Sequence, residues 1–338
     1  MTGDGLGRLT SLVDLARQRA THHRTLHVGP IPVRLSGTSS EQLARFADPL
    51  VASPGSGWAQ LDVIITTSEE IPRSSIPPPL QPRDHHTAVA YEKGMTALAT
   101  GATGTLWLLD SNRATAVLWI DDGDASPLSE QSSPLRTAAR WWSSVQGAAM
   151  AHAGAVADAQ GCVLLVGDSG AGKSTTTMAC HGTGLEILGD DFCIVEPPTR
   201  TAPSIVHAMY RLAKLDERAL DLLPHLRERI VGDSWRGKKL IDLATAEQPA
   251  RPIVAICHVV QDQSTRTHVS PISRVRTLRA FAPSTMFQQR LWDRETWDVL
   301  AAIVRSARCY QLTVSDVRSV PEVVGSILDG EALHGATF

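Results

Sequence analysis

A glycine-rich segment has the residue types and spacing that bind phosphate. Residues 163–175 read Val-Leu-Leu-Val-Gly-Asp-Ser-Gly-Ala-Gly-Lys-Ser-Thr, which matches the G-x-x-x-x-G-K-[ST] pattern directly after an apolar run. Glycines let backbone N–H groups turn toward phosphate oxygens, and the N-terminus of a following helix adds a favourable dipole. Lys173 can reach the β and γ phosphates, and the Ser174 hydroxyl can be a ligand of Mg²⁺. The pattern predicts a nucleoside triphosphate site whose contact residues are Gly167, Asp168, Ser169, Gly170, Ala171, Gly172, Lys173, Ser174 and Thr175.

Two adjacent aspartates, Asp190 and Asp191, follow the apolar run Leu185–Leu188 and a glycine. We expect this run to be a strand that neighbours the phosphate loop, where a carboxylate can hold Mg²⁺ or orient a nucleophile. Two carboxylates permit both tasks, one facing the metal and one facing an incoming hydroxyl, and their mutual repulsion tends to raise the pKa of one of them. A solvated Asp-Asp turn after a strand is the alternative structural interpretation.

A basic turn is the third candidate. The segment Gly232–Asp242 places Arg236, Lys238 and Lys239 around a glycine. Such a composition suits the binding of phosphate or of an acidic substrate tail. A solvent-exposed basic β-turn explains it equally well. We predict Arg236 and Lys238 as further phosphate contacts.

The elements that must position these residues alternate between strand and helix. A helix is expected over Leu135–Met150, followed by a strand near Val156 and a strand over Val163–Val166. A helix begins at Lys173, and Leu185–Leu188 predicts the next strand. The alternation predicts a P-loop α/β domain.

The sequence before this domain has a mixed α/β pattern. Its last four expected strands are separated by Gly or Asn turns, which indicates an antiparallel meander. The expected elements are helices over Leu6–Ala20 and Glu41–Phe46, one strand over Thr25–Leu35 interrupted by two prolines, and strands over Leu61–Thr66, Thr87–Tyr91, Met95–Ala99, Thr105–Asp110 and Thr115–Ile120.

The polar, turn-rich stretch Asp121–Pro134 predicts a linker. A length of 338 residues fits two domains. We therefore predict an accessory or substrate-docking domain over residues 1–133 and a catalytic domain over residues 134–338. No catalytic constellation is expected in the first domain, because the adjacent His85 and His86 lack a third ligand at fixed spacing and are better explained as solvated loop residues.

The order of these motifs resembles a known family. Met150–Val156 (Met-Ala-His-Ala-Gly-Ala-Val), the GDSGAGKST loop, a helix and Gly184–Asp191 follow one another as in the catalytic domain of HPr kinase/phosphorylase, and the resemblance spans about residues 145–330. It implies a P-loop kinase domain of the HPr kinase C-terminal type, with ATP and Mg²⁺ as cofactors. It further implies Asp190, Lys173 and His152 as catalytic residues, with Asp190 as the general base, and Ser174 and Asp191 as metal ligands. A core histidine beside an Ala-rich strand is the alternative for His152, and Arg211 and Lys214 are weaker candidates for substrate contacts.

The sequence also departs from HPr kinase. It lacks the glycine/arginine-rich segment that follows the aspartate pair in that family, and it lacks a P-G-R-N loop. It looks more like the diverse HPr-kinase-like serine kinases, some of which phosphorylate the C-terminal serine of a lasso-peptide precursor. The expected activity is phosphorylation of a serine on a peptide or protein. A small-molecule kinase acting on free serine or a sugar, and a nucleotide-sensing regulator without turnover, are the alternatives.

Composition restricts partners and compartment. A net charge of −3 gives no general attraction to nucleic acid or anionic membrane, so neither is expected as a partner. Five cysteines without CxxC spacing indicate reduced thiols. The N-terminus has no basic start followed by an apolar stretch, so no secretory signal is expected. We expect a cytoplasmic protein, and the resemblance implies a homo-oligomer.

Overall fold

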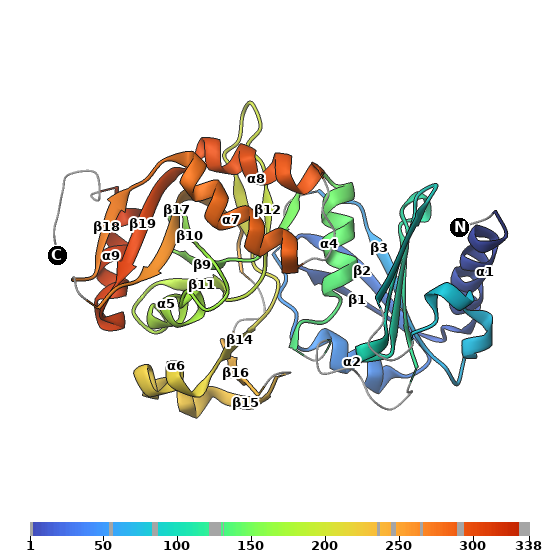
Figure 1. Cartoon of the computed structure of the whole chain (residues 1–338). Coiled ribbons are helices and arrows are strands. Elements are labelled where there is room, and N and C mark those ends of the chain that lie inside the picture. The colour runs from blue at the N-terminus through green and yellow to red at the C-terminus, as the bar shows by residue number, and fades with distance from the viewer. Residues whose placement is uncertain are drawn as a thin grey trace. The chain divides into compact units, whose positions relative to one another are not determined.

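The computed structural model describes residues 3–53, 57–82, 87–121, 130, 132–234, 237–244, 248–263, 266–288 and 294–330. The chain forms two compact units, one of Met1–Leu50 with Ser56–Gln146 and one of Val51–Gly55 with Gly147–Phe338 (Figure 1). The predicted boundary at 133/134 precedes helix α4 (Arg136–Val145), whereas the compact units divide after that helix. The reason is that α4 packs in the first unit, where Trp142 Nε1 donates to Ala59 O at 3.0 Å. His85 and His86 lie outside the described residues.

The first unit is built on a seven-stranded sheet in the order β1-β2-β3-β7-β6-β5-β4. Strands β4 to β7 form the predicted antiparallel meander, and β3 pairs with β2 and β7 in parallel. The strand expected over Thr25–Leu35 is wrong, because Gly29, with a φ of 57°, and Pro30 turn the chain into a hairpin of β1 and β2. The helices and strands of this unit are α1 (Gly3–Arg19), β1 (His22–Val28), β2 (Ile31–Gly37), α2 (Ser40–Ala47), β3 (Leu61–Thr67), β4 (Thr87–Glu92), β5 (Met95–Thr100), β6 (Thr105–Asp110), β7 (Thr115–Ile120) and α4.

The second unit is built on a nine-stranded mixed sheet in which β11-β9-β10-β17-β13-β12-β8 form one path and β19 pairs with both β17 and β18. The helix expected over Leu135–Met150 ends at Val145, because Gly147, with a φ of 75°, stops it and the chain enters β8. The strands of this sheet are β8 (Ala149–Ala151), β9 (Gly154–Ala157), β10 (Cys162–Val166), β11 (Glu186–Gly189), β12 (Cys193–Glu196), β13 (Ile205–His207), β17 (Arg251–Gln261), β18 (His268–Pro271) and β19 (Arg308–Val314).

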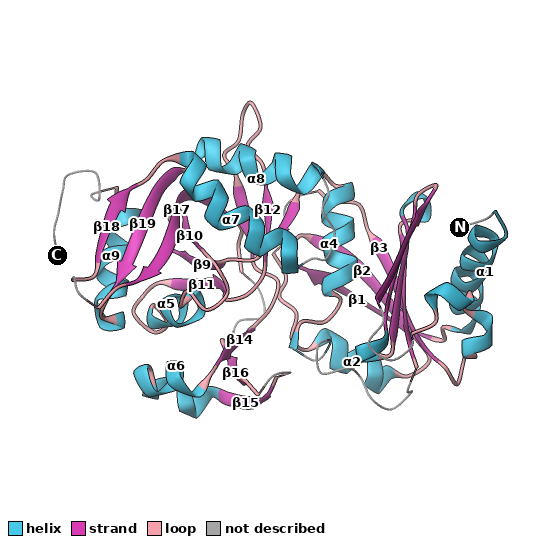
Figure 2. Ribbon diagram, in the orientation of Figure 1, coloured by secondary structure: helices cyan, strands magenta, loops and turns pink. Residues whose placement is uncertain are grey.

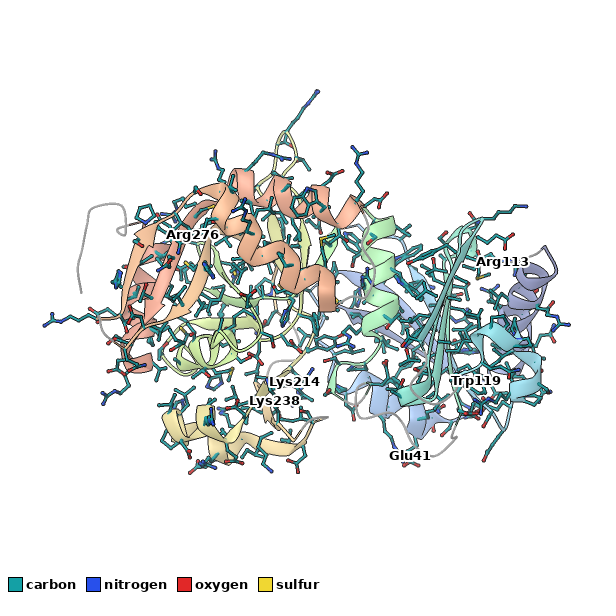
Figure 3. All side chains as sticks on the ribbon, in the orientation of Figure 1. Glu41, Arg113, Trp119, Lys214, Lys238 and Arg276 are labelled. Carbon is teal, nitrogen blue, oxygen red and sulfur yellow. The ribbon has the colours of Figure 1, made fainter. Side chains whose placement is uncertain are left out.

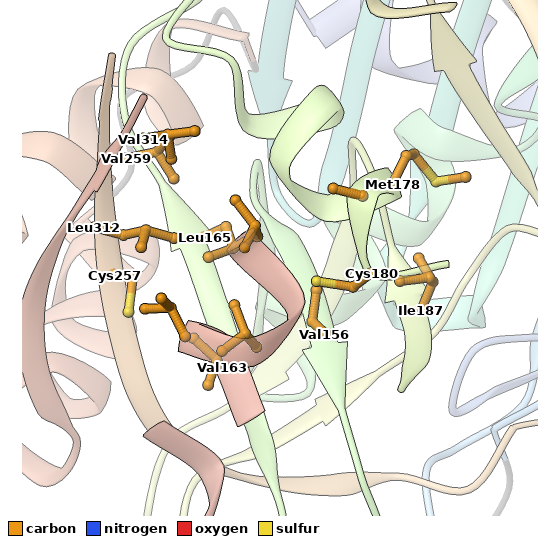
Figure 4. Close-up of a cluster of buried hydrophobic side chains, with 14 of the residues drawn as sticks. Val156, Val163, Leu165, Met178, Cys180, Ile187, Cys257, Val259, Leu312 and Val314 are labelled. Carbon is orange, nitrogen blue, oxygen red and sulfur yellow. The ribbon is translucent and has the colours of Figure 1, made fainter. Parts of the chain in front are cut away.

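Strand β10 is buried on both faces, which explains its continuous apolar sequence. Val163 and Leu165 enter a core shared with α5 (Lys173–Ala179), α6 (Glu217–Leu222) and α9 (Val320–Leu328), shown in Figure 4. Leu164 and Val166 enter a second core shared with α7 (Arg274–Gln288) and α8 (Arg294–Ser306). Helices therefore cover both faces of the sheet (Figure 2), and the fold class is mixed α/β as predicted.

A small antiparallel sheet completes the second unit. Its order is β14-β16-β15, with β14 at Leu212–Leu215, β15 at Ile230–Asp233 and β16 at Lys239–Asp242. The turn between β15 and β16 is the basic segment singled out in the sequence.

The cysteines are free thiols, and most of them lie in the interior. All five cysteines are unpaired, and all but Cys309 are buried. Burial raises the pKa of the Cys180 thiol to about 12, so this thiol is protonated at neutral pH. Within the described ranges, no helix combines the length and apolar character needed to cross a bilayer.

Candidate functional site

The glycine-rich loop (Gly167–Gly172) joins the end of β10 to the start of α5. Gly167, Gly170 and Gly172 have φ values of 148°, 85° and 87°, in a region that L side chains rarely adopt. At Gly172 the space is also closed, since a Cβ there would lie 2.4 Å from Gln261 Nε2. The glycines of the motif are thus favoured by backbone conformation, and at Gly172 also by the nearby Gln261 side chain.

Lys173 is almost fully buried at the end of this loop, with 6% of its surface exposed. Its Nζ donates to Gly167 O at 2.9 Å and to Asp168 O at 3.0 Å, so the side chain turns back over the loop. Burial lowers the pKa of Lys173, and the charges of Asp191, Asp190 and Asp168 oppose that shift. The predicted lysine and the predicted aspartate pair therefore lie close enough to interact.

Asp190 follows β11 directly and is 5% exposed. Its Oδ2 accepts a hydrogen bond from the backbone N–H of Lys214 at 2.8 Å, and the Ser174 side chain lies near enough to its carboxyl to favour the ionised form. Its Oδ1 is buried without a hydrogen-bond partner. Burial raises the pKa of Asp190, and the neighbouring Asp191 adds to the effect.

Asp191 has a different environment. Its Oδ1 lies 3.2 Å from His152 Nε2, and its Oδ2 accepts from Lys214 Nζ at 3.0 Å. Burial works against ionisation, but the Lys214 ammonium and His152 outweigh it and hold the pKa of Asp191 below its ordinary value. The two adjacent carboxyls are thus separated in proton affinity, with burial as the main cause of the raised pKa of Asp190 and the repulsion from Asp191 as a smaller one.

His152 follows β8 and is 7% exposed. Its backbone N–H donates to Thr285 Oγ1 of α7 at 3.1 Å, and its ring centroid lies 5.5 Å from that of Phe192. Nε2 contacts Asp191, whereas Nδ1 is buried without a partner. The histidine belongs to the same cluster as the aspartate pair.

The strand that leads to the aspartates, β11, is not the direct neighbour of β10 that we expected. The neighbours of β10 are β9 and β17, so β11 is one strand further from the loop than predicted. Because β9 is antiparallel to both β10 and β11, these two strands still end at the same edge of the sheet. Gly154 of β9 lets α5 approach, since a Cβ there would meet Thr177 Oγ1 at 2.0 Å. This close approach brings Ser174 to Asp190 across the intervening strand.

Of the metal ligands predicted from the resemblance, Ser174 and Asp191, Ser174 lies near Asp190 instead. Both oxygens of Asp191 have cationic or histidine neighbours. Among the residues that the structure describes, no group of three or more His, Cys, Asp or Glu side chains could hold a metal ion. Mg²⁺ in nucleotide sites commonly takes only one or two protein oxygens besides phosphate oxygens, so a hydroxyl and a carboxylate in contact suit it.

Lys238 of the basic turn lies near enough to the site for its charge to act there. It adds to the effect of burial in lowering the pKa of Lys173, and it partly opposes the effect of burial in raising the pKa of Asp190. Lys239 instead binds the exposed Asp233 at 2.6 Å. Arg211, the weaker candidate, forms two hydrogen bonds with Asp242 at 3.1 and 2.6 Å. Arg236 lies outside the described residues.

Two residues at the end of β17 contact the loop and were missed in the sequence. Gln261 Nε2 donates to Ala171 O at 3.5 Å. His258 Cδ2 would lie 3.4 Å from a Cβ at Gly167, its Nδ1 is buried without a partner, and burial lowers its pKa. The available signal was a pair of polar residues ending an apolar run, since ligands bind at the carboxyl ends of parallel strands.

The assembled site combines a glycine-rich loop, a lysine, a serine hydroxyl and a buried carboxylate with an unused oxygen. No protein-family model matches the chain, and no curated protein matches it either. The chemistry open to these groups is the binding of an oxyanion by the loop and lysine, with proton acceptance by Asp190 beside it.

Proposed function

We propose that the chain is a kinase that transfers the γ-phosphoryl group of ATP, with Mg²⁺, to a serine hydroxyl of a peptide or protein. The observation that carries the proposal is Asp190, whose Oδ1 is buried and unpartnered in a carboxyl that lies near Ser174 and Lys173. On the basis of the same loop and aspartate pair, we also propose that the second unit is a P-loop domain of the HPr kinase C-terminal type. Five unpaired thiols favour a reducing compartment such as the cytoplasm.

In this proposal the loop amides and Lys173 hold the phosphates, and Asp190 Oδ1 accepts the proton of the acceptor hydroxyl. The acceptor oxygen forms a bond to the γ phosphorus while the bond from that phosphorus to the β-phosphate oxygen breaks, and ADP leaves. A carboxylate whose pKa is raised by burial is a stronger base than an exposed aspartate, which suits proton acceptance. Lys173 and the loop stabilise charge on the transferring group.

Ser174 and an oxygen of the Asp190–Asp191 pair are the proposed protein ligands of Mg²⁺. The fit rests on the donor set, a serine hydroxyl near two adjacent carboxyls, because hard oxygen donors are what this ion prefers, and it leaves Asp190 Oδ1 for the proton. When bound, Mg²⁺ supplies neutralisation of charge on the β and γ phosphates.

The acceptor is tested by labelling. The purified chain is incubated with radiolabelled γ-phosphate ATP and Mg²⁺, and with peptides that end in serine, carry serine internally, or end in alanine. Free serine and a sugar panel are run in parallel. The proposal predicts label on a serine peptide; label on a metabolite without peptide supports the small-molecule alternative.

The regulator alternative is separated by the Asp190→Asn variant, with Asp233→Asn as a matched surface control. The proposal predicts that Asp190→Asn binds ATP but transfers no label, while Asp233→Asn behaves as the unmodified chain. Tight ATP binding with the same low turnover in all three proteins would overturn the kinase proposal in favour of the regulator.

A further inference from the structure

We propose that Lys214 is a positioning residue that fixes both aspartates of the pair from one backbone position, an inference that rests on the proposed kinase function. Its backbone N–H donates to Asp190 Oδ2 at 2.8 Å, and its Nζ donates to Asp191 Oδ2 at 3.0 Å. With Oδ2 held, Oδ1 is the oxygen of Asp190 that remains for a proton. One residue therefore determines which oxygen of Asp190 faces the acceptor.

The small sheet explains why Lys214 can make both contacts. Strand β14 lies at the edge of the order β14-β16-β15, so one side of its backbone is free of strand pairing and its N–H can reach Asp190. Lys214 and Lys238 both come from this sheet, the first from β14 and the second from the turn before β16 (Figure 3). The sheet thus presents two lysines to the aspartate cluster.

The side chain of Lys214 is 14% exposed, so its ammonium acts in a partly desolvated environment. An ion pair there reduces the repulsion between two adjacent carboxylates, which would otherwise disfavour ionisation of both. The other charged or titratable groups that act on the pair are His152, Lys173 and Lys238. The ammonium thus holds Asp191 Oδ2 in place while the backbone N–H of the same residue holds Asp190 Oδ2.

The test compares Lys214→Met with Lys214→Arg and with the control Lys239→Met. Lys239 belongs to the same small sheet and binds an exposed aspartate, so its loss reports on the sheet alone. We expect Lys214→Met to lower kcat by about 10²-fold with KM for ATP unchanged, since misplacement of a reacting group costs about that much. Lys214→Arg recovers part of kcat, and Lys239→Met matches the unmodified chain.

A Lys214→Met variant with the kcat of the Lys239→Met control would overturn the proposal, as would an effect confined to KM for ATP. A readout without turnover separates this proposal from the kinase proposal. Aspartate labelled with ¹³C at the carboxyl is observed by NMR at pH 7, with assignments from Asp190→Asn and Asp191→Asn. If the unmodified chain transfers no phosphate, the kinase proposal fails; a Lys214→Met substitution that leaves the carboxyl resonances of Asp190 and Asp191 where they are in the unmodified chain overturns the role of Lys214.

Discussion

Two buried carboxyls, one in each unit, differ in how many of their oxygens have hydrogen-bond partners. Glu130 of the first unit has both oxygens occupied, because Oε1 accepts from Trp107 Nε1 at 3.3 Å and Oε2 accepts from Leu135 N at 3.0 Å. Asp190 of the second unit has one oxygen occupied and one unused. Burial raises the pKa of both. A raised pKa is therefore shared, and the unused oxygen is what distinguishes the site.

Two buried histidines of the second unit repeat the contrast. His207 has partners on both ring nitrogens, with Ser53 Oγ at 3.2 Å and Glu196 Oε1 at 2.7 Å. His152 has a carboxylate on Nε2 and nothing on Nδ1. A buried polar atom left unbonded costs about 1–3 kcal/mol, so a cluster of such atoms needs an explanation beyond stability.

Unpaired buried atoms also occur elsewhere in the described chain, for example on Glu92, Trp141 and Tyr310. The hydroxyl of Tyr310 and the indole of Trp141 are neutral groups, whereas Glu92 is ionisable, so an unpaired atom by itself does not mark a site. Around the glycine-rich loop the unpaired groups include a carboxyl oxygen and two imidazole nitrogens. The proposed function accounts for that concentration, because a ligand would satisfy the atoms that the protein does not.

The largest expected effect comes from Lys173→Ala. This variant removes the buried ammonium of the loop edge, and we expect phosphotransfer to fall to background in the labelling assay, with ATP affinity reduced in calorimetry. Lys239→Ala, which removes an exposed ammonium, is the matched control and should retain full activity. Substantial transfer by Lys173→Ala would remove this lysine from the catalytic machinery.

The comparison of the two carboxyls is tested directly by Asp190→Asn and Glu130→Gln. Asp190→Asn should lower kcat by about 10²–10⁴-fold, the usual contribution of a general base, while calorimetry shows ATP binding retained. Glu130→Gln should leave kcat unchanged and lower the free energy of unfolding by about 1–3 kcal/mol, because an amide N–H would face the Trp107 or Leu135 donor. If both variants lose activity equally, the unused oxygen is not what marks the site.

Asp190→Asn should raise the thermal stability although it lowers the activity. A carboxyl with a raised folded-state pKa adds stability below its ordinary pKa of 3.8, and that contribution is lost as pH rises through the folded pKa. At neutral pH the ionised Asp190 is therefore a net cost, and Asp190→Asn should raise Tm by about 2–4 °C. Thermal melts at pH 7 measure the change, with Asp233→Asn as the exposed control. A lower Tm for Asp190→Asn would show that its ionised form is well solvated.

The sequence predicted those parts of the site that are local in the chain. The loop, Lys173 and the adjacent aspartates are recognisable because a short pattern specifies each of them. The contacts between them were not predictable, since they depend on β9 lying between β10 and β11 and on Gly154 admitting α5. That packing also explains why Ser174 lies near Asp190 rather than Asp191, and why Lys214 donates hydrogen bonds to both aspartates.

In the fold too, the parts that could be predicted are those that a local sequence pattern specifies. The meander from β4 to β7 was recognisable because each strand alternates with a turn of a few residues. The hairpin of β1 and β2 was missed because prolines within an apolar run resemble an interrupted strand as well as a turn. Gly29 supplies the positive φ that decides between them.

The smallest expected effect is at Gln261, whose side chain touches the loop without carrying charge. Its Nε2 donates to Ala171 O at 3.5 Å, a long hydrogen bond from an exposed side chain, so it supports the loop conformation only weakly. We expect Gln261→Ala to raise KM for ATP by about two- to threefold, in line with the loss of one modest hydrogen bond, and to leave kcat unchanged. Gln311→Ala, on the adjacent strand β19, is a suitable control. A large fall in kcat would place Gln261 in contact with the transferring group and extend the functional cluster from β11 to β17.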